Sequence, residues 1–234
     1  MARFLFVPVP VAGHVAPTLA LVRGVVARGH EVTVYTSARY RTAVKRAGAT
    51  HAPFHRATDV ELERLNELFP DRPSKAGIRQ GLWDMKKFVV DAAEERLVDL
   101  EPIVDSMLPH AVVADVMALA GQFVAEKRCL PLAVLNPVNL FISSCDTFPD
   151  GFGVAPSATP LGRLRNRGAN FQVHNVALRG VNVHVHRLRK QLGLVRVRAS
   201  LMEQEMDALF GQLGRTTGTA LRHDAVRPSH ARQP

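Results

Sequence analysis

The stretch that decides the fold is residues 3–22, which read RFLFVPVPVAGHVAPTLALV. Residues 4–9 form an apolar run too short for a globular helix and punctuated by prolines, which predicts a buried strand. Leucine, valine and alanine then recur at helical spacing, and Pro17 suits a first helical turn, where its missing N–H would lack a partner. His14 therefore falls in a strand-to-helix crossing, which is where open α/β sheets bind their ligands.

The alternation of strand and helix continues through the first 135 residues. Strands are expected at residues 31–36, 50–54, 111–116 and 130–135, and helices at residues 38–47 and 118–128. Strands that alternate with helices over short connections form a parallel sheet with right-handed crossovers. We therefore expect an α/β fold with a doubly wound, mostly parallel, Rossmann-like sheet. Residues 9–15 contain one glycine instead of the three of a dinucleotide fingerprint, so NAD or FAD binding is not favoured.

Further helices are expected between and after the strands. Thr58 and Glu61 have capping-box spacing, which predicts a short helix ending near Phe69. Apolar residues at steps of three and four predict a long helix over residues 78–104, and Pro102 is expected to kink or split it.

A last helical stripe covers residues 161–192 and contains two histidines. On a helix, His184 and His186 point about 200° apart and cannot ligate one metal ion, so no metal site is expected.

The net charge of +9 is concentrated at the C-terminal end. Residues 161–234 contain 13 of the 30 Lys and Arg residues but 4 of the 21 Asp and Glu residues. A DNA-binding domain carries its basic face on the folded body, so this distribution argues against nucleic acid as a partner. Residues 195–234 are expected to form a divergent, disordered basic tail, because their second half has almost no apolar periodicity.

The GHVAP motif at residues 13–17, placed after an N-terminal buried strand, resembles the start of the two-domain GT-B glycosyltransferases. The likeness is in particular to the bacterial macrolide and UDP-glycosyltransferases, and residues 187–194 resemble the stretch that closes their acceptor domain. The resemblance implies that residues 1–194 form the acceptor-binding domain, a single GT-B half with extra helices. It also implies a UDP- or TDP-sugar as co-substrate and no cofactor bound by this chain.

For His14, the resemblance implies the role of general base on the acceptor hydroxyl. The residue type fits, because the unperturbed pKa of imidazole lies near neutral pH. For Asp115, the resemblance implies a carboxylate that orients the ring and stabilises the imidazolium. The residues alone leave other interpretations open, since His14 could fill a loop or cap a helix and Asp115 could cap the helix that begins near Ala118. Their expected positions at the same sheet edge favour the catalytic pair.

Six residues are candidates for an acceptor pocket: Gly13, Phe54, Trp83, Phe88, Asn136 and Phe141. Gly13 has no side chain, so a substrate can come close to it. Trp83 and Phe88 lie off the apolar stripe of their expected helix, although core packing is the usual role of large aromatic residues. Asn136 and Phe141 follow the last strand, where an ordinary surface loop is the other interpretation.

In the family, a second Rossmann-like domain binds the donor. Residues 195–234 contain no donor-binding segment and are too few to form such a domain, so the sequence predicts a truncated or frameshifted reading frame without it. Translation of the downstream DNA in the other frames would test this expectation. An interdomain face left uncovered would favour self-association.

The resemblance implies an inverting hexosyltransferase that transfers a sugar to a hydroxyl of an apolar small molecule, here in an incomplete form. The alternative is a non-catalytic acceptor-binding or auxiliary protein that pairs with a complete glycosyltransferase. Nucleic-acid binding through the basic tail ranks below both.

The cysteines and the apolar segments bear on the compartment. Cys129 and Cys145 lack C-x-x-C spacing, which favours free thiols in a reducing cytosol over a disulfide or a zinc site. The apolar N-terminus lacks the features of a signal peptide, and no uninterrupted apolar stretch approaches membrane-spanning length. A cytoplasmic protein without a membrane span is expected.

Overall fold

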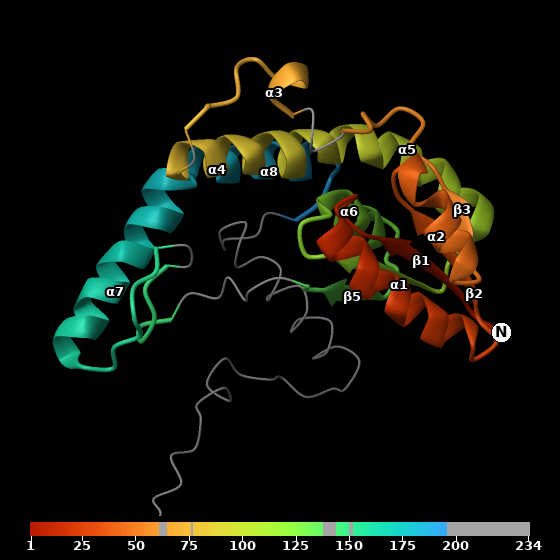
Figure 1. The fold of residues 1–234 in the computed structure, drawn as a ribbon, viewed down its shortest axis with the longest axis horizontal. Helices are drawn as coiled ribbons and strands as arrows, with labels where there is room; N and C mark the ends of the chain where they lie inside the picture. The colour runs from red at the N-terminus through yellow and green to blue at the C-terminus, as the bar shows by residue number, and fades with distance from the viewer. Residues whose placement is uncertain (61–64, 76, 138–143, 150–151, 196–234) are drawn as a thin grey trace, which may run out of the picture.

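The computed structural model describes residues 1–60, 65–75, 77–137, 144–149 and 152–195. Its centre is a sheet of five parallel strands, shown in Figure 1: β1 (Arg3–Val7), β2 (Glu31–Tyr35), β3 (Thr50–Ala52), β4 (Ala111–Asp115) and β5 (Leu132–Leu135). The strand order is β3-β2-β1-β4-β5, and every neighbouring pair is parallel. The order reverses direction at β1, which confirms the doubly wound α/β sheet.

Both faces of the sheet are covered. The helices next to it are α1 (Ala12–Val26), α2 (Arg41–Arg46), α5 (Ala92–Met107) and α6 (Leu119–Lys127). Successive side chains of a strand point to opposite faces. Accordingly, Phe6 belongs to an apolar cluster with α1 and α2, whereas Leu5 and Val7 belong to a second cluster with α5 and α6. Burial on both faces explains why β1 reads as a continuous apolar run.

Helix α6 lies directly on the two central strands. A Cβ atom added to Gly121 would lie 2.9 Å from the Cβ of Val7 and 3.0 Å from the Cβ of Ala114. Real Cβ atoms do not approach this closely, so glycine is required for this contact. The close approach fixes the ends of β1 and β4 against one helix.

A long helical rod crosses the top of Figure 1. It consists of α4 (Ile78–Asp84), a π-helical segment η3 (Met85–Asp91) and α5. The expected break at Pro102 is wrong, because α5 continues past it to Met107. The carbonyl that loses its N–H partner belongs to Val98, which is 55% exposed, so water can bind it. The irregularity lies instead in η3, where each turn holds an extra residue.

The start of α1 also differs from the expectation. The helix begins at Ala12, so Pro17 lies in its interior and not in the first turn. The carbonyl that Pro17 leaves without an N–H is that of Gly13, an exposed residue that water can reach.

The segment expected to form a capping box is bonded to α5. The backbone N–H and the hydroxyl of Thr58 both donate to Glu95 Oε2, at 2.7 Å and 2.9 Å. Helix α3 (Leu65–Leu68) follows, and residues 61–64 lie outside the described part of the chain.

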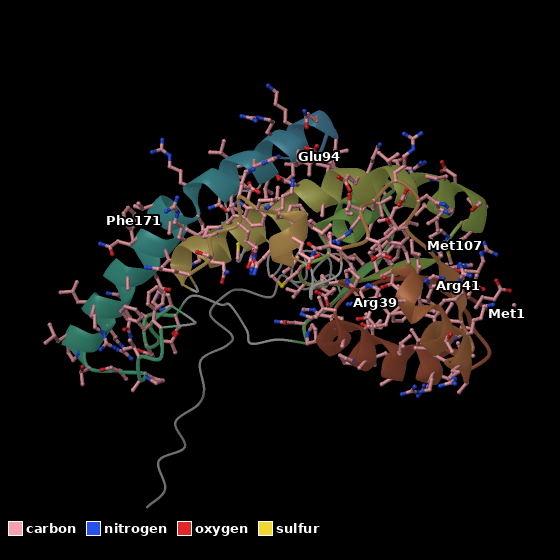
Figure 2. The ribbon with its side chains drawn as sticks, turned by 45° about the horizontal axis from the view of Figure 1, so that its top comes forward. Met1, Arg39, Arg41, Glu94, Met107 and Phe171 are labelled. Carbon is pink, nitrogen blue, oxygen red and sulfur yellow. The ribbon has the colours of Figure 1, made fainter. Side chains whose placement is uncertain are left out.

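The last helices leave the sheet and return to it. Helix α7 (Pro160–Gln172) extends away from the body, and through η4 (Val173–Ala177) it leads to α8 (Arg179–Gln191), which packs against η3. Figure 2 shows Phe171 of α7 and Met1 at opposite ends of the molecule. The expected tail lies, apart from Val195, outside the described residues. No helix of the described segments is long and apolar enough to cross a membrane.

Candidate active site

The first candidate, His14, is held by the turn between β1 and α1. The Val11 carbonyl accepts hydrogen bonds from the N–H groups of His14 and Val15, both at 2.9 Å, and these bonds begin the helix. His14 therefore lies in the first turn of α1, whereas the sequence predicted a position in the crossing before the helix. Since β1 is central, this turn stands at the carboxyl edge of the sheet.

The second candidate, Asp115, is the last residue of β4, the strand next to β1. Its side chain is fully buried, and its Oδ2 lies 2.7 Å from Nδ1 of His14. Its Oδ1 accepts a hydrogen bond from the backbone N–H of Met117 at 2.9 Å. Ala118 is the N-cap of α6, and no side chain bonds to that end of the helix. The structure thus brings His14 and Asp115 together, and Asp115 does not act as the helix cap.

This pairing determines which ring nitrogen is available for chemistry. A carboxylate accepts hydrogen bonds, so the Nδ1–H of His14 donates to Asp115, and in the neutral ring the lone pair is then on Nε2. The imidazole side chain is 12% exposed, whereas the carboxylate is 0% exposed. The arrangement is a buried anion that orients a base accessible from outside.

A cavity of about 130 Å³ lies beside the turn that leads to His14. Its walls include Val9, Pro10 and Val11 from this turn and Phe88 and Arg96 from the long helical rod. Half of the remaining walls are apolar, and the other half are polar or charged, among them Asp91 and Glu95. His14 itself is not a wall. The cavity can therefore enclose part of an apolar molecule beside the turn that precedes His14.

The candidate acceptor residues differ in their relation to this cavity. Phe88 lines it, and Trp83 packs edge-on against Phe88, with ring centroids 5.8 Å apart. Phe54 packs instead against Tyr35, with centroids 4.9 Å apart. It belongs to the second apolar cluster and not to the cavity walls.

The three other candidates are not part of these walls in the described residues. Gly13 is exposed, and a Cβ atom there would meet nothing within 4 Å. Asn136 is half-buried, one residue beyond β5. Phe141 lies outside the residues that the structure describes.

The sequence analysis missed a buried polar network on α5. Asp99, which is 3% exposed, accepts the Tyr35 hydroxyl at 2.9 Å and the backbone N–H groups of His55, Arg56 and Ala57 at 2.8–3.2 Å. Burial alone would raise the pKa of Asp99, but these donors outweigh it and lower that pKa. Burial, together with the bond to Asp99, raises the pKa of Tyr35. The sequence signal for this network was the presence of charged residues, such as Asp99, within the apolar stripe of residues 78–104.

The remaining histidines of interest lie on α8. His184 is near Asp91 (Nδ1 to Oδ1, 3.4 Å) and Glu94 (Nε2 to Oε1, 3.6 Å), the latter labelled in Figure 2. In the described parts of the chain, no group of three or more His, Cys, Asp or Glu side chains is placed to hold a metal ion.

Comparison with known proteins agrees with this geometry. The chain is 32% identical over 205 residues to 4'-demethylrebeccamycin synthase of Lentzea aerocolonigenes, which covers 88% of this chain and 49% of that protein. It is 28% identical over 127 residues to NDP-glycosyltransferase YjiC of Bacillus subtilis, covering 54% and 30%. No protein-family model matches. The chain thus spans at most about half the length of these curated relatives.

Two solved structures share the fold. The glycotransferase of kitacinnamycin superposes with a TM-score of 0.57 at 21% identity, over 85% of this chain and 42% of that one. The calicheamicin glycosyltransferase CalG4 superposes with a TM-score of 0.52 at 20% identity, over 88% and 44%.

Fold and site define a Rossmann-like sheet with a carboxylate-bound histidine at its carboxyl edge. The relatives and structural neighbours of this chain are glycosyltransferases of the GT-B, macrolide and UDP-glycosyltransferase type, and the chain matches about half of their length or less.

Proposed function

We propose that residues 1–194 are the acceptor-binding domain of an inverting glycosyltransferase. The observation that carries this proposal is the 2.7 Å contact between His14 Nδ1 and Asp115 Oδ2 at the carboxyl edge of β1 and β4. His14 is the proposed catalytic base, and Asp115 is the proposed positioning residue.

In the proposed step, Nε2 of His14 accepts the proton of an acceptor hydroxyl. The hydroxyl oxygen forms a bond to the anomeric carbon of the donor sugar while the bond from that carbon to the diphosphate breaks, and the electron pair of the broken bond leaves with the nucleotide diphosphate. Attack from the face opposite the leaving group inverts the anomeric configuration. Asp115 stabilises the imidazolium that results.

The proposed acceptor is an apolar small molecule with a hydroxyl group. The apolar walls of the cavity beside His14 support this class. The proposed donor is a UDP- or TDP-sugar. The names of two relatives, an NDP-glycosyltransferase and a UDP-glucosyltransferase of Starmerella bombicola, support a nucleotide sugar.

Donor binding needs a further part. The described residues form one sheet, and no second sheet for the nucleotide occurs among them. We propose that a donor-binding half, in a longer product or in a partner protein, supplies helix N-termini and side chains that neutralise the leaving diphosphate. Two free cysteines, Cys129 and Cys145, are compatible with the reducing cytoplasm as the site of the reaction.

The test fuses this chain to the C-terminal half of 4'-demethylrebeccamycin synthase and measures sugar transfer from UDP- and TDP-sugars to hydroxylated polycyclic acceptors. We expect transfer by the fusion and its loss in His14→Gln and Asp115→Asn. His55→Gln is the matched control, because His55 is an exposed histidine. Transfer that persists in His14→Gln would refute the proposed base.

The second candidate is an acceptor-binding or auxiliary protein without catalysis. Calorimetry on the unfused chain separates the two. Acceptor binding without UDP binding is expected for either, so the decisive result is the fusion, since a binding protein would stay inactive there.

A further inference from the structure

Arg96 is a buried cation without a hydrogen-bonding partner. It lies on α5 and is 8% exposed, and its Nε is buried with no hydrogen bond. None of the ion pairs among the described residues includes it. A guanidinium has five N–H donors, and leaving a buried charge unpaired is strongly unfavourable.

The neighbouring carboxylates hydrogen-bond to other groups. These bonds join Asp99 to Tyr35 and to three backbone N–H groups, Glu95 to Thr58, and Asp59 to Ser37 and to the N–H of Ala38. The contact that Arg96 does make is with the Phe54 ring, whose centroid lies 5.5 Å from the guanidinium carbon. This cation–π contact leaves the buried Nε–H without an acceptor.

Arg96 is also a wall of the cavity beside the β1–α1 turn. The other cationic wall residue, Lys87, pairs with Asp91 at 3.9 Å and lies 5.6 Å from the centroid of the Phe69 ring. Among the described cavity walls, Arg96 is therefore the cation without a hydrogen bond or ion pair, although the Glu95 carboxylate is close enough to stabilise its charge. The cavity combines apolar walls and two carboxylates, Asp91 and Glu95, with one buried donor, the Arg96 Nε–H, that no acceptor satisfies.

We propose that Arg96 is a specificity-determining residue that binds an anionic oxygen, such as a carboxylate, on an otherwise apolar acceptor. The guanidinium fork can donate two parallel hydrogen bonds to such a group. The identification of this ligand as the acceptor rests on the proposed function. Val11 connects the two sites, because it lines the cavity and its carbonyl holds the N–H of His14. An acceptor anchored at Arg96 would thus lie against the turn from which His14 projects.

The test measures binding of two probes with the same apolar body, 2-naphthoate and the neutral 2-naphthamide, to the full chain by calorimetry. We expect the chain to prefer 2-naphthoate by about 10- to 100-fold, since a hydrogen bond to a charged group contributes this much. Arg96→Met should abolish the preference, and Arg96→Lys, which keeps the charge without the fork, should reduce it. Arg56→Met, which removes an exposed arginine near the same segment, should retain it.

A purely structural role of Arg96 predicts other results. If Arg96 served only the fold, Arg96→Met would lower the thermal midpoint and leave the choice of probe unchanged. Under the proposal, the unliganded Arg96→Met protein is at least as stable as the wild type, because an unpaired buried charge is removed. Equal or absent binding of the two probes by the wild-type chain overturns the proposal whatever the variants do.

The two proposals can fail separately. 2-Naphthoate has no hydroxyl group, so its binding does not depend on sugar transfer. Loss of the anion preference, with transfer still dependent on His14, would remove the role of Arg96 alone. A clear anion preference in a fusion that transfers sugar without His14 would remove the proposed base and keep the anion site.

Discussion

Among the residues that the structure describes, two aspartates are buried, and their surroundings differ. Asp99 on α5 accepts four hydrogen bonds, from Tyr35 and three backbone N–H groups. Asp115 at the end of β4 accepts one backbone N–H and one imidazole that is itself 12% exposed. All donors to Asp99 are fixed parts of the fold, whereas one donor to Asp115 reaches the surface.

The difference teaches how a structural carboxylate is distinguished from a functional one. Both residues are almost fully buried, so burial does not separate them. The groups that donate hydrogen bonds to each carboxylate separate them. Asp99 ties the segment after β3 to a helix, and its loss should act on stability. Asp115 bonds to His14, the proposed base, and its loss should act on catalysis.

The largest expected effect is on catalysis by the pair at the sheet edge. In the active fusion, His14→Gln and Asp115→Asn should each lower kcat by about 10²- to 10⁴-fold, because the base or its orientation is lost. The double variant should be little worse than either single one, since the residues act as a unit. Steady-state kinetics with His55→Gln as control measures this, and strictly multiplicative losses would contradict a shared role.

The next largest effect is on stability at Asp99. Asp99→Asn should lower the free energy of unfolding by about 3 kcal/mol, because buried donors lose a charged acceptor. Urea denaturation of the unfused chain measures it. The matched control is Asp105→Asn, whose side chain is 59% exposed and pairs with Arg128 at the surface; it should change stability by less than about 1 kcal/mol. Equal losses for the two variants would erase the distinction between buried network and surface pair.

The free energy of unfolding should also depend on pH, because folding shifts the pKa values of Asp99 and Tyr35. Because the folded-state pKa of Asp99 is lowered from its ordinary value of 3.8, its contribution is complete above that value and is lost as the pH falls below it. The raised pKa of Tyr35 acts in the opposite direction, so its contribution is present below pH 10.0 and is lost as the pH rises above it. Wild type should therefore lose more stability in acid than Asp99→Asn, and more in alkali than Tyr35→Phe. Parallel unfolding curves across pH would refute this.

The smallest effect belongs to a single neutral donor. Tyr35→Phe removes one hydrogen bond to Asp99 and should lower the free energy of unfolding by about 1 kcal/mol. In an Asp99→Asn background the same change should have less effect, because the two groups are coupled. Additive losses in this double-mutant cycle would show that the 2.9 Å contact contributes nothing.

The sheet and the pairing of His14 with Asp115 could be predicted from the sequence. Apolar runs mark parallel strands because both of their faces are buried, and residues just past the ends of neighbouring parallel strands meet at one edge. This edge placed His14 near Asp115 although they lie 101 residues apart. The prediction also drew on the resemblance to the GT-B glycosyltransferases, because the residues alone left other roles open for both side chains.

The helices and the polar network could not be predicted in the same way. Pro17 and Pro102 are tolerated inside helices because the carbonyls that they leave without an N–H donor belong to exposed residues. Exposure depends on the tertiary structure, so the sequence does not give it. The π-helical insertion leaves the apolar spacing almost unchanged. Arg96 and Asp99 looked like interruptions of a stripe, since only folding brings the loop after β3 against α5.

The π-helical segment η3 has a consequence for how this scaffold diversifies. A residue removed from Met85–Asp91 would restore ordinary α-helical winding and turn α4 by about 100° relative to α5. Trp83 would rotate away from Phe88, while β1 and β4 would keep His14 and Asp115 in place. Insertion or deletion of one residue in this segment would therefore change the side chains near the cavity and leave the His14–Asp115 pair in place.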